Sequence, residues 1–286
     1  MALAVGANLA LTLAQIAGGL FAGSLALVAD AIHNLSDALS LVIALAARRI
    51  ARRPASAAMT FGYGRAGAVA ALVNYTLLAA IGAWLAVEAC LGLVDPQPVV
   101  GWVVVAVAAV ALAVDVATVR LTRPMAAGSA NMRAAVLHNL ADALGSIAVL
   151  VSGVLVILYD WRLVDPLLTL AIAAYVLWHV GRDAGGVVRV LMLGSPPDVE
   201  VDAVLDAIAE VEGVADVHHL HLWQLDERRN ALDAHVTIEA GQWRRADAVK
   251  AAVKRRLAQR FAVAHTTIEL ECAAHACVRP ARVGAD

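Results

Sequence analysis

Two short segments of this sequence carry the same pair of metal-ligating side chains at the same spacing. His33 precedes Asp37 by four residues, and His138 precedes Asp142 by four residues. Because an α-helix completes a turn about every 3.6 residues, the two side chains of each pair project from one face of a helix. Two such helices facing each other would supply two imidazoles and two carboxylates, which is a complete tetrahedral set for zinc.

Both motifs lie in stretches that are apolar enough to cross a membrane. The chain has 286 residues, of which 61% are hydrophobic, and its mean hydropathy is +0.75. Ionisable groups are costly inside a bilayer and therefore indicate function. This ligand set suits zinc, tolerates cadmium or cobalt, and is poor for manganese or magnesium, which prefer more oxygens. We therefore expect a metal ion to bind inside the membrane.

Asp30 lies one turn before the first motif, on roughly the same side of the helix as His33. Three roles are consistent with this position. Asp30 could be a proton relay, a first ligand for an incoming ion, or a helix cap near the outer membrane surface; we favour a position near the mouth of the site.

Six apolar segments come close to the ~20 residues needed to span the hydrocarbon region. They cover residues 2–22, 25–50, 66–94, 99–121, 130–159 and 163–187. The first segment has no basic n-region and no convincing cleavage site, so we expect a retained membrane helix and not a signal peptide. The sequence thus predicts an α-helical membrane protein whose residues 1–190 form a bundle of six transmembrane helices.

The distribution of arginine predicts the orientation of this bundle. Arginines flank the second and fourth connections and follow the sixth segment, whereas the first and third connections have no basic residue. By the positive-inside rule, both termini are cytoplasmic. The Arg-over-Lys and Ala/Val-rich composition suggests a GC-rich bacterium, and hence a multi-pass protein of the cytoplasmic (inner) membrane. The net charge of -2 and the lack of a basic run argue against a nucleic-acid partner.

The pattern changes after the Gly-Ser-Pro-Pro sequence at residues 194–197. We expect a helix over residues 198–212, strands over 217–225 and 231–239, a helix over 244–261 and a last strand over 265–271. The order α-β-β-α-β predicts a ferredoxin-like α+β domain over residues 195–286.

Five of the nine histidines lie on the predicted strands of this region, together with Glu269 and Glu271; they are His218, His219, His221, His235 and His265. Strand alternation places His235 and Glu271 on one face of the sheet, opposite the apolar residues. The same alternation is awkward for His218, which alternates with two leucines, and it would accept His219 or His221 instead. A polar sheet face with solvated histidines is the alternative to a metal site.

A second cluster of soft ligands lies near the end of the chain. Cys272, His275 and Cys277 form a C-x-x-H-x-C sequence. These side chains are candidates for metal binding, and a plain pair of thiols is the alternative. With three cysteines in the chain, a disulfide framework is not expected.

Several motifs, in order along nearly the whole chain, resemble those of the cation diffusion facilitator family of zinc transporters. The resemblance is carried by residues 24–37, 61–65, 138–142, 217–223, 234–236 and 265–271. It implies a homodimer in which the second and fifth helices of each protomer hold the transported ion, with cytoplasmic Zn(II) exchanged for protons. It also implies a metallochaperone-like fold for the C-terminal domain.

The resemblance also implies roles for individual residues. By that likeness, the transport-site ligands are His33, Asp37, His138 and Asp142. A regulatory metal site in the cytoplasmic domain is assigned to His218, His235 and Glu271.

We therefore expect efflux of a divalent cation, most simply Zn(II), with Cd(II) or Co(II) as further candidates, by proton antiport and alternating access. A membrane metal sensor that binds without transport is the alternative. An enzyme is not expected, since the sequence has no H-E-x-x-H motif and four protein ligands leave no open coordination position. No ATP-binding G-x-x-x-x-G-K-S/T loop occurs either.

Overall fold

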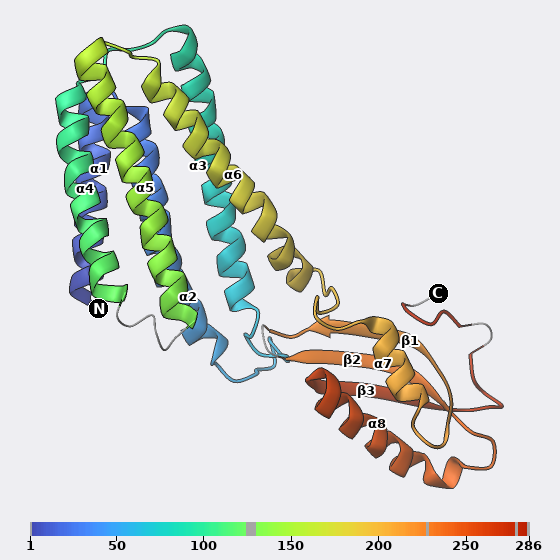
Figure 1. Ribbon diagram of the computed structural model, residues 1–286. Coiled ribbons are helices and arrows are strands. Elements are labelled where there is room, and N and C mark those ends of the chain that lie inside the picture. The colour runs from blue at the N-terminus through green and yellow to red at the C-terminus, as the bar shows by residue number, and fades with distance from the viewer. Residues whose placement is uncertain (1, 124–129, 227–228, 278–279, 285–286) are drawn as a thin grey trace. The chain divides into compact units, whose positions relative to one another are not determined.

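The computed structural model describes residues 2–123, 130–226, 229–277 and 280–284, apart from the side chains of residues 2–9, 37, 38, 40, 41, 121, 122, 130–135 and 138. The described residues first form six long helices (Figure 1). They are α1 (Ala2–Ala22), α2 (Leu25–Ala51), α3 (Ala66–Val94), α4 (Gly101–Thr122), α5 (Ala130–Tyr159) and α6 (Val164–Leu191). Each predicted apolar segment is therefore helical, and α6 runs a turn beyond its predicted end at residue 187.

Four of these helices are long and apolar enough to span a membrane within the described residues. The spans lie in α3, α4, α5 and α6, with mean hydropathies of 2.1, 2.4, 2.2 and 1.5. Helices α1 and α2 contribute the shorter apolar stretches Ala10–Ala22 and Leu25–Ser36. Large apolar side chains such as Trp84, Trp102 and Trp178 are exposed. An outer surface of this kind is expected where helices face lipid, so the predicted helical membrane domain is confirmed.

Small residues let the membrane helices approach closely. Helix α5 packs on α4 at Gly153, where a Cβ atom would lie 2.9 Å from a methyl group of Val105. Helix α3 packs on α6 at Gly82, where a Cβ atom would lie 3.2 Å from the Leu177 side chain. Such contacts are typical of membrane helices, whose association depends on close packing because lipid tails are as apolar as the side chains.

Helix α2 begins at a cap made by residues far apart in the sequence. The carboxylate of Asp165, in the first turn of α6, accepts hydrogen bonds from the backbone N–H groups of Leu25 (2.8 Å) and Ala26 (3.2 Å) and from the Ser24 hydroxyl. The first N–H groups of a helix have no partner within the helix, and a carboxylate also complements the helix dipole. The cap fixes the start of α2, which carries the first His-x-x-x-Asp motif, against α6.

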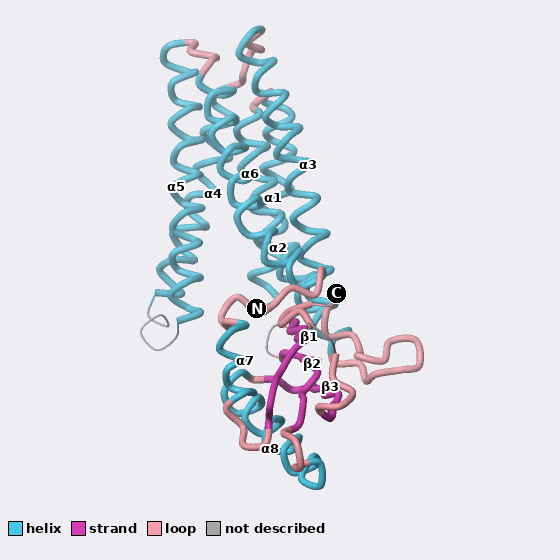
Figure 2. Tube along the Cα trace, turned by 90° about the vertical axis from the view of Figure 1, so that its right-hand side faces the viewer, coloured by secondary structure: helices cyan, strands magenta, loops and turns pink. Residues whose placement is uncertain are grey.

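The C-terminal domain has the predicted order of elements. It consists of α7 (Val201–Ala209), β1 (Val214–Gln224), β2 (Asn230–Ile238), a 3-10 turn η2 (Trp243–Arg245), α8 (Ala246–Phe261) and β3 (Val263–Cys272). The strand order is β1-β2-β3, with β1 antiparallel and β3 parallel to the central strand. Helices α7 and α8 lie on one side of the sheet (Figure 2).

The core of this domain lies between the two helices and the sheet. Leu205 and Ile208 of α7 and Leu257 of α8 pack against Leu232 and Val236 of the central strand, and all five are buried. Because side chains alternate along a strand, the other sheet face carries the histidines and glutamates. The predicted α+β domain is confirmed.

Candidate metal centres

The structure describes the side chains of two of the four predicted intramembrane ligands, His33 in α2 and Asp142 in α5; those of Asp37 and His138 lie outside the described side chains. His33 is half-buried and lies edge-on to Tyr175 of α6, with ring centroids 6.1 Å apart. Apolar side chains of α2, α3 and α6 surround the imidazole. Such a shell controls the access of solvent to a metal site.

Helices α2 and α5 meet close to the two motifs. Gly145 of α5 lies against Asp30 of α2, because a Cβ atom at Gly145 would be 3.1 Å from Asp30 Oδ1. Asp30 is one turn before His33, and Gly145 is three residues after Asp142. The contact therefore brings the two motif-bearing helices together at one point, within about one turn of each motif.

Three carboxylates from three helices gather in this region. Asp30 is 4% exposed and accepts a hydrogen bond of 3.0 Å from Gln15 of α1. Asp115 of α4 accepts a hydrogen bond of 2.9 Å from the Ser146 hydroxyl of α5. Both Asp115 and Asp142 lie close enough to Asp30 for their charges to interact. The interpretation of Asp30 as a cap is wrong, because Asp165 and Ser24 cap α2 and Asp30 is buried inside the bundle.

A third His-x-x-x-Asp sequence, which was not among the predicted sites, lies in α6. His179 Nε2 is 3.2 Å from Asp183 Oδ2. The His179 ring stacks on Tyr175, with centroids 6.2 Å apart, and Tyr175 in turn contacts His33. The rings of His33, Tyr175 and His179 thus form a row that leads from α2 along α6. The same four-residue spacing was the signal that could have found this pair.

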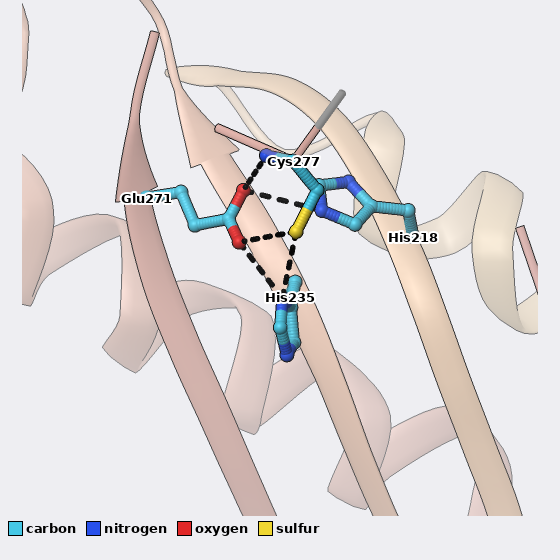
Figure 3. A group of neighbouring side chains, drawn as sticks. All are labelled: His218, His235, Glu271 and Cys277. Carbon is cyan, nitrogen blue, oxygen red and sulfur yellow. Dashed lines mark hydrogen bonds and ion pairs between the residues drawn. The ribbon is translucent and has the colours of Figure 1, made fainter. Parts of the chain in front are cut away.

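In the C-terminal domain, four side chains converge on the sheet face opposite α7 and α8 (Figure 3). They are His218 of β1, His235 of β2, Glu271 of β3 and Cys277 from the segment after β3, and one ligand atom from each lies within 4.8 Å of all the others. Glu271 is central, with Oε1 2.8 Å from His235 Nδ1 and Oε2 3.2 Å from His218 Nε2. The structure therefore brings the three predicted regulatory ligands together and adds a thiol.

Both imidazoles of this cluster are oriented by an acidic neighbour. His218 is 1% exposed; its Nδ1 lies 3.2 Å from Asp216 Oδ2, which leaves its buried Nε2 facing the Glu271 carboxylate. The His235 Nε2 atom lies 3.3 Å from Glu269 Oε2, which leaves Nδ1 facing the cluster. Metal-binding histidines commonly hold a carboxylate at the second ring nitrogen in this way.

The environment of Glu271 favours its charged form. Burial acts to raise the pKa of this carboxyl, but hydrogen bonds from His235 and from the backbone N–H and thiol of Cys277 outweigh burial. The pKa of Glu271 is therefore lower than its ordinary value. A carboxylate that is ionised near neutral pH is ready to bind a cation.

An irregularity in β1 explains why strand alternation was a poor guide to its histidines. His218 pairs with His235 and His221 pairs with Asp233, so β1 contains one extra residue between these pairs. His219 has a φ of +50°, a left-handed conformation typical of such a bulge. The extra residue lets Val217 and Leu220 both face the core and leaves His218 on the opposite face. His218, and neither His219 nor His221, belongs to the four-residue cluster.

The C-x-x-H-x-C sequence does not form one site. Cys272 Sγ lies 3.1 Å from His275 Nδ1. Cys277 Sγ lies instead 3.4 Å from Glu271 Oε1 and 3.9 Å from His235 Nδ1. The three residues are close in the sequence, but the fold places Cys272 beside His275 and places Cys277 in the cluster around Glu271.

Known proteins resemble the chain over most of its length. The family described as "Cation efflux transmembrane domain" matches residues 1–192, and the family described as "Cation efflux protein, cytoplasmic domain" matches residues 196–273. The zinc transporter ZitB of Pectobacterium atrosepticum is 35% identical over 264 residues, which is 90% of this chain and 80% of the relative.

Two further relatives agree with this result. A cadmium, cobalt and zinc/H(+)-K(+) antiporter of Bacillus velezensis is 33% identical over 90% of this chain and 83% of the relative. The metal cation efflux system protein CzcD of Cupriavidus metallidurans is 33% identical over 91% of this chain and 82% of the relative. The chain therefore belongs to the cation diffusion facilitator family of metal-efflux membrane proteins.

Proposed function

We propose that this protein exports Zn(II) in exchange for protons and holds the ion between α2 and α5 through His33, Asp37, His138 and Asp142. The observation that carries the proposal is the repeated His-x-x-x-Asp motif on two membrane helices that meet within one turn of each motif. The names of the relatives agree, since one is a zinc transporter and another a cadmium, cobalt and zinc/H(+)-K(+) antiporter. Cd(II) and Co(II) are the next candidates, because they accept the same nitrogen and oxygen ligands.

The ligand chemistry couples the metal to protons. Zinc binds neutral imidazoles and ionised carboxylates, so loading the site releases whatever protons these groups hold. When the loaded site opens toward a more acidic compartment, protons return to the ligands and the metal leaves. A site near the bilayer midplane that opens to one side at a time needs only this exchange of metal for protons to move the metal across the membrane. Because the sequence has no G-x-x-x-x-G-K-S/T loop, the proton gradient is the energy source that we propose.

The C-terminal cluster is proposed as a regulatory metal site. His218, His235 and Glu271 offer two nitrogens and one carboxylate to a cation. The matching family is described as a cytoplasmic domain, which agrees with the orientation expected from the arginines. In a homodimer, metal bound to two such domains would tighten their association when the cytoplasmic zinc concentration rises, and would thereby favour efflux.

Zinc flux into acid-loaded proteoliposomes tests the transport proposal. The wild type is expected to move Zn(II) only when the pH gradient is present, and Asp37→Ala and Asp142→Ala are each expected to abolish this movement. Asp95→Ala is the matched control, since it removes an exposed carboxylate from the connection between α3 and α4. Flux that survives Asp142→Ala would refute the site assignment.

The same vesicles distinguish a transporter from a membrane metal sensor. A sensor binds Zn(II) at equilibrium but shows no pH-dependent movement of the ion. Binding without flux in the wild type, in vesicles whose proton gradient is verified with a dye, would favour the sensor.

A further inference from the structure

We propose that Cys277 is the fourth ligand of the C-terminal metal site, and that its sulfur makes this site selective for thiophilic ions such as Cd(II) and Zn(II). The inference rests on the regulatory site proposed above and names the residue that decides its selectivity. The alternative is that Cys277 binds no metal and its thiol only donates a hydrogen bond to Glu271.

The distances fit coordination by four protein atoms. Cys277 Sγ lies 3.4 Å from Glu271 Oε1 and 3.9 Å from His235 Nδ1, and His218 Nε2 completes a group within 4.8 Å. Bonds of about 2.0–2.3 Å to a tetrahedral zinc ion place its ligand atoms roughly 3.3–3.8 Å apart. A contraction of about 1 Å or less in the longest separation is therefore enough to surround the ion.

A buried nitrogen supports a ligand at this place independently of the thiol. His218 is 1% exposed, and its Nε2 atom lies 3.2 Å from Glu271 Oε2 without forming a hydrogen bond to any residue that the structure describes. In a neutral ring whose Nδ1–H group donates to Asp216, the buried Nε2 lone pair faces a carboxylate oxygen, and two such acceptors repel each other. A metal ion among Nε2, the Glu271 carboxylate and the Cys277 thiolate removes that repulsion.

The segment that carries Cys277 is held across the ligand face. We call residues 273–277 and 280–284 the C-terminal strap. The strap leaves the sheet at β3, and the Cys277 N–H group donates to Glu271 Oε2 at 3.3 Å. Its far end pairs with β1, where Leu220 N–H donates to Arg282 O (3.1 Å) and Gly284 N–H donates to Leu220 O (3.2 Å). The strap thus runs from one edge strand to the other, and Cys277 lies over the central histidine.

The fourth ligand changes the chemistry of the site. The thiol binds metal as a thiolate, so its proton leaves on coordination. Soft thiolate ligands select zinc-like and cadmium-like ions, whereas carboxylate-rich sites suit magnesium and manganese. Four protein ligands also close the coordination sphere, as in structural zinc sites. The site is thus suited to sensing thiophilic metals and not to catalysis.

Titration of the full-length, detergent-solubilised protein with Cd(II) tests the proposal. The readout is the near-ultraviolet sulfur-to-cadmium charge-transfer absorption, to which the proposed intramembrane site contributes nothing because it contains no sulfur. The wild type is expected to gain this absorption with one Cd(II) per chain. Cys277→Ser should abolish it and weaken binding at this site by at least about tenfold, since even partners outside the ligand set commonly account for 10–100-fold.

Cys272→Ser is the matched control, because its Sγ contacts His275 and lies outside the cluster. This variant should keep both the absorption and the affinity. Absorption that persists in Cys277→Ser, or that disappears in Cys272→Ser, would overturn the proposal.

His235→Ala separates failure of this inference from failure of the regulatory site itself. If this variant binds as many Cd(II) ions as the wild type, the whole C-terminal site is wrong. If it loses one Cd(II) while Cys277→Ser retains wild-type affinity, a three-ligand site stands and Cys277 is not a ligand.

Discussion

The two candidate metal sites of this protein are built in opposite ways. In the proposed membrane site, each helix carries a pair of candidate ligands four residues apart, as in His33 and Asp37. In the C-terminal domain, the ligands come one each from three strands and the strap, between His218 and Cys277. Helical spacing shows local ligand pairs directly in the sequence, whereas a site built across a sheet depends on strand register, which the sequence shows poorly.

The largest expected effects test whether the two sites are independent. His33→Ala should lower Zn(II) flux by at least about 100-fold, because a direct ligand matters more than the outer partners that account for 10–100-fold. It should leave the Cd(II)–sulfur absorption of the C-terminal site unchanged. His218→Ala should abolish that absorption but should lower the zinc flux far less than His33→Ala does, because the proposed regulatory metal adjusts transport and is not the transported ion. Loss of both properties in either variant would mean that the two sites are not separate.

A smaller effect is expected from the contact between α2 and α5. Gly145→Ala would place a methyl group 3.1 Å from Asp30 Oδ1, and overpacking of this kind costs about 1–3 kcal/mol. We expect zinc flux to fall about fivefold or more, because that cost shifts the two motif-bearing helices apart. Gly181→Ala is the matched control, since nothing lies within 4 Å of a Cβ atom there. Equal flux in the two variants would argue against a site at this helix contact.

Loss of the cap of α2 should lower the stability of the fold more than it lowers zinc transport. Asp165→Asn removes the charge that accepts hydrogen bonds from Leu25 and Ala26, and we expect a loss of about 1–2 kcal/mol in the free energy of unfolding. Thermal unfolding in detergent measures this as a lower Tm. Asp160→Asn, which changes an exposed carboxylate paired with Arg162, should leave Tm unchanged. A normal Tm in Asp165→Asn would show that the cap does not stabilise α2.

The smallest effect is expected at the third His-x-x-x-Asp pair. If the ring row from His179 to His33 guides the ion, His179→Ala should raise the zinc concentration for half-maximal flux by about threefold. The effect is small because an exposed ion pair such as His179–Asp183 contributes at most ~1 kcal/mol. Maximal flux should stay the same, and His221→Ala, which removes an exposed histidine outside the cluster, should change neither value. A lower maximal flux in His179→Ala would instead indicate a role inside the transport site.

The helices were the part of the fold that the sequence predicted best. Apolar segments bounded by Gly-Ser, Pro and Arg residues mark helix ends locally. Helices α1, α3 and α5 end at the predicted residue, α2 and α4 end one residue later, and α6 ends four residues later. The Asp165 cap was not predicted, because its partner Ser24 lies 141 residues away. A carboxylate at the start of one helix gives no sign of which other helix it caps.

The C-terminal site was predicted in part. Alternation correctly placed His235 and Glu271 on one face, but the bulge at His219 broke the alternation that His218 would otherwise have followed. Cys277 was grouped with Cys272 because of its spacing, while the fold carries it to the central strand. Bulges and returning segments are set by long-range packing, and short sequence patterns do not contain that information.

The pairing of the strap with β1 also limits how copies of the protein can associate. A bare outer strand is a template for another chain, which can extend the sheet by main-chain pairing. Here the backbone N–H and C=O groups of Leu220 are already taken by Arg282 and Gly284. Sheet extension between copies is therefore blocked at this stretch of β1.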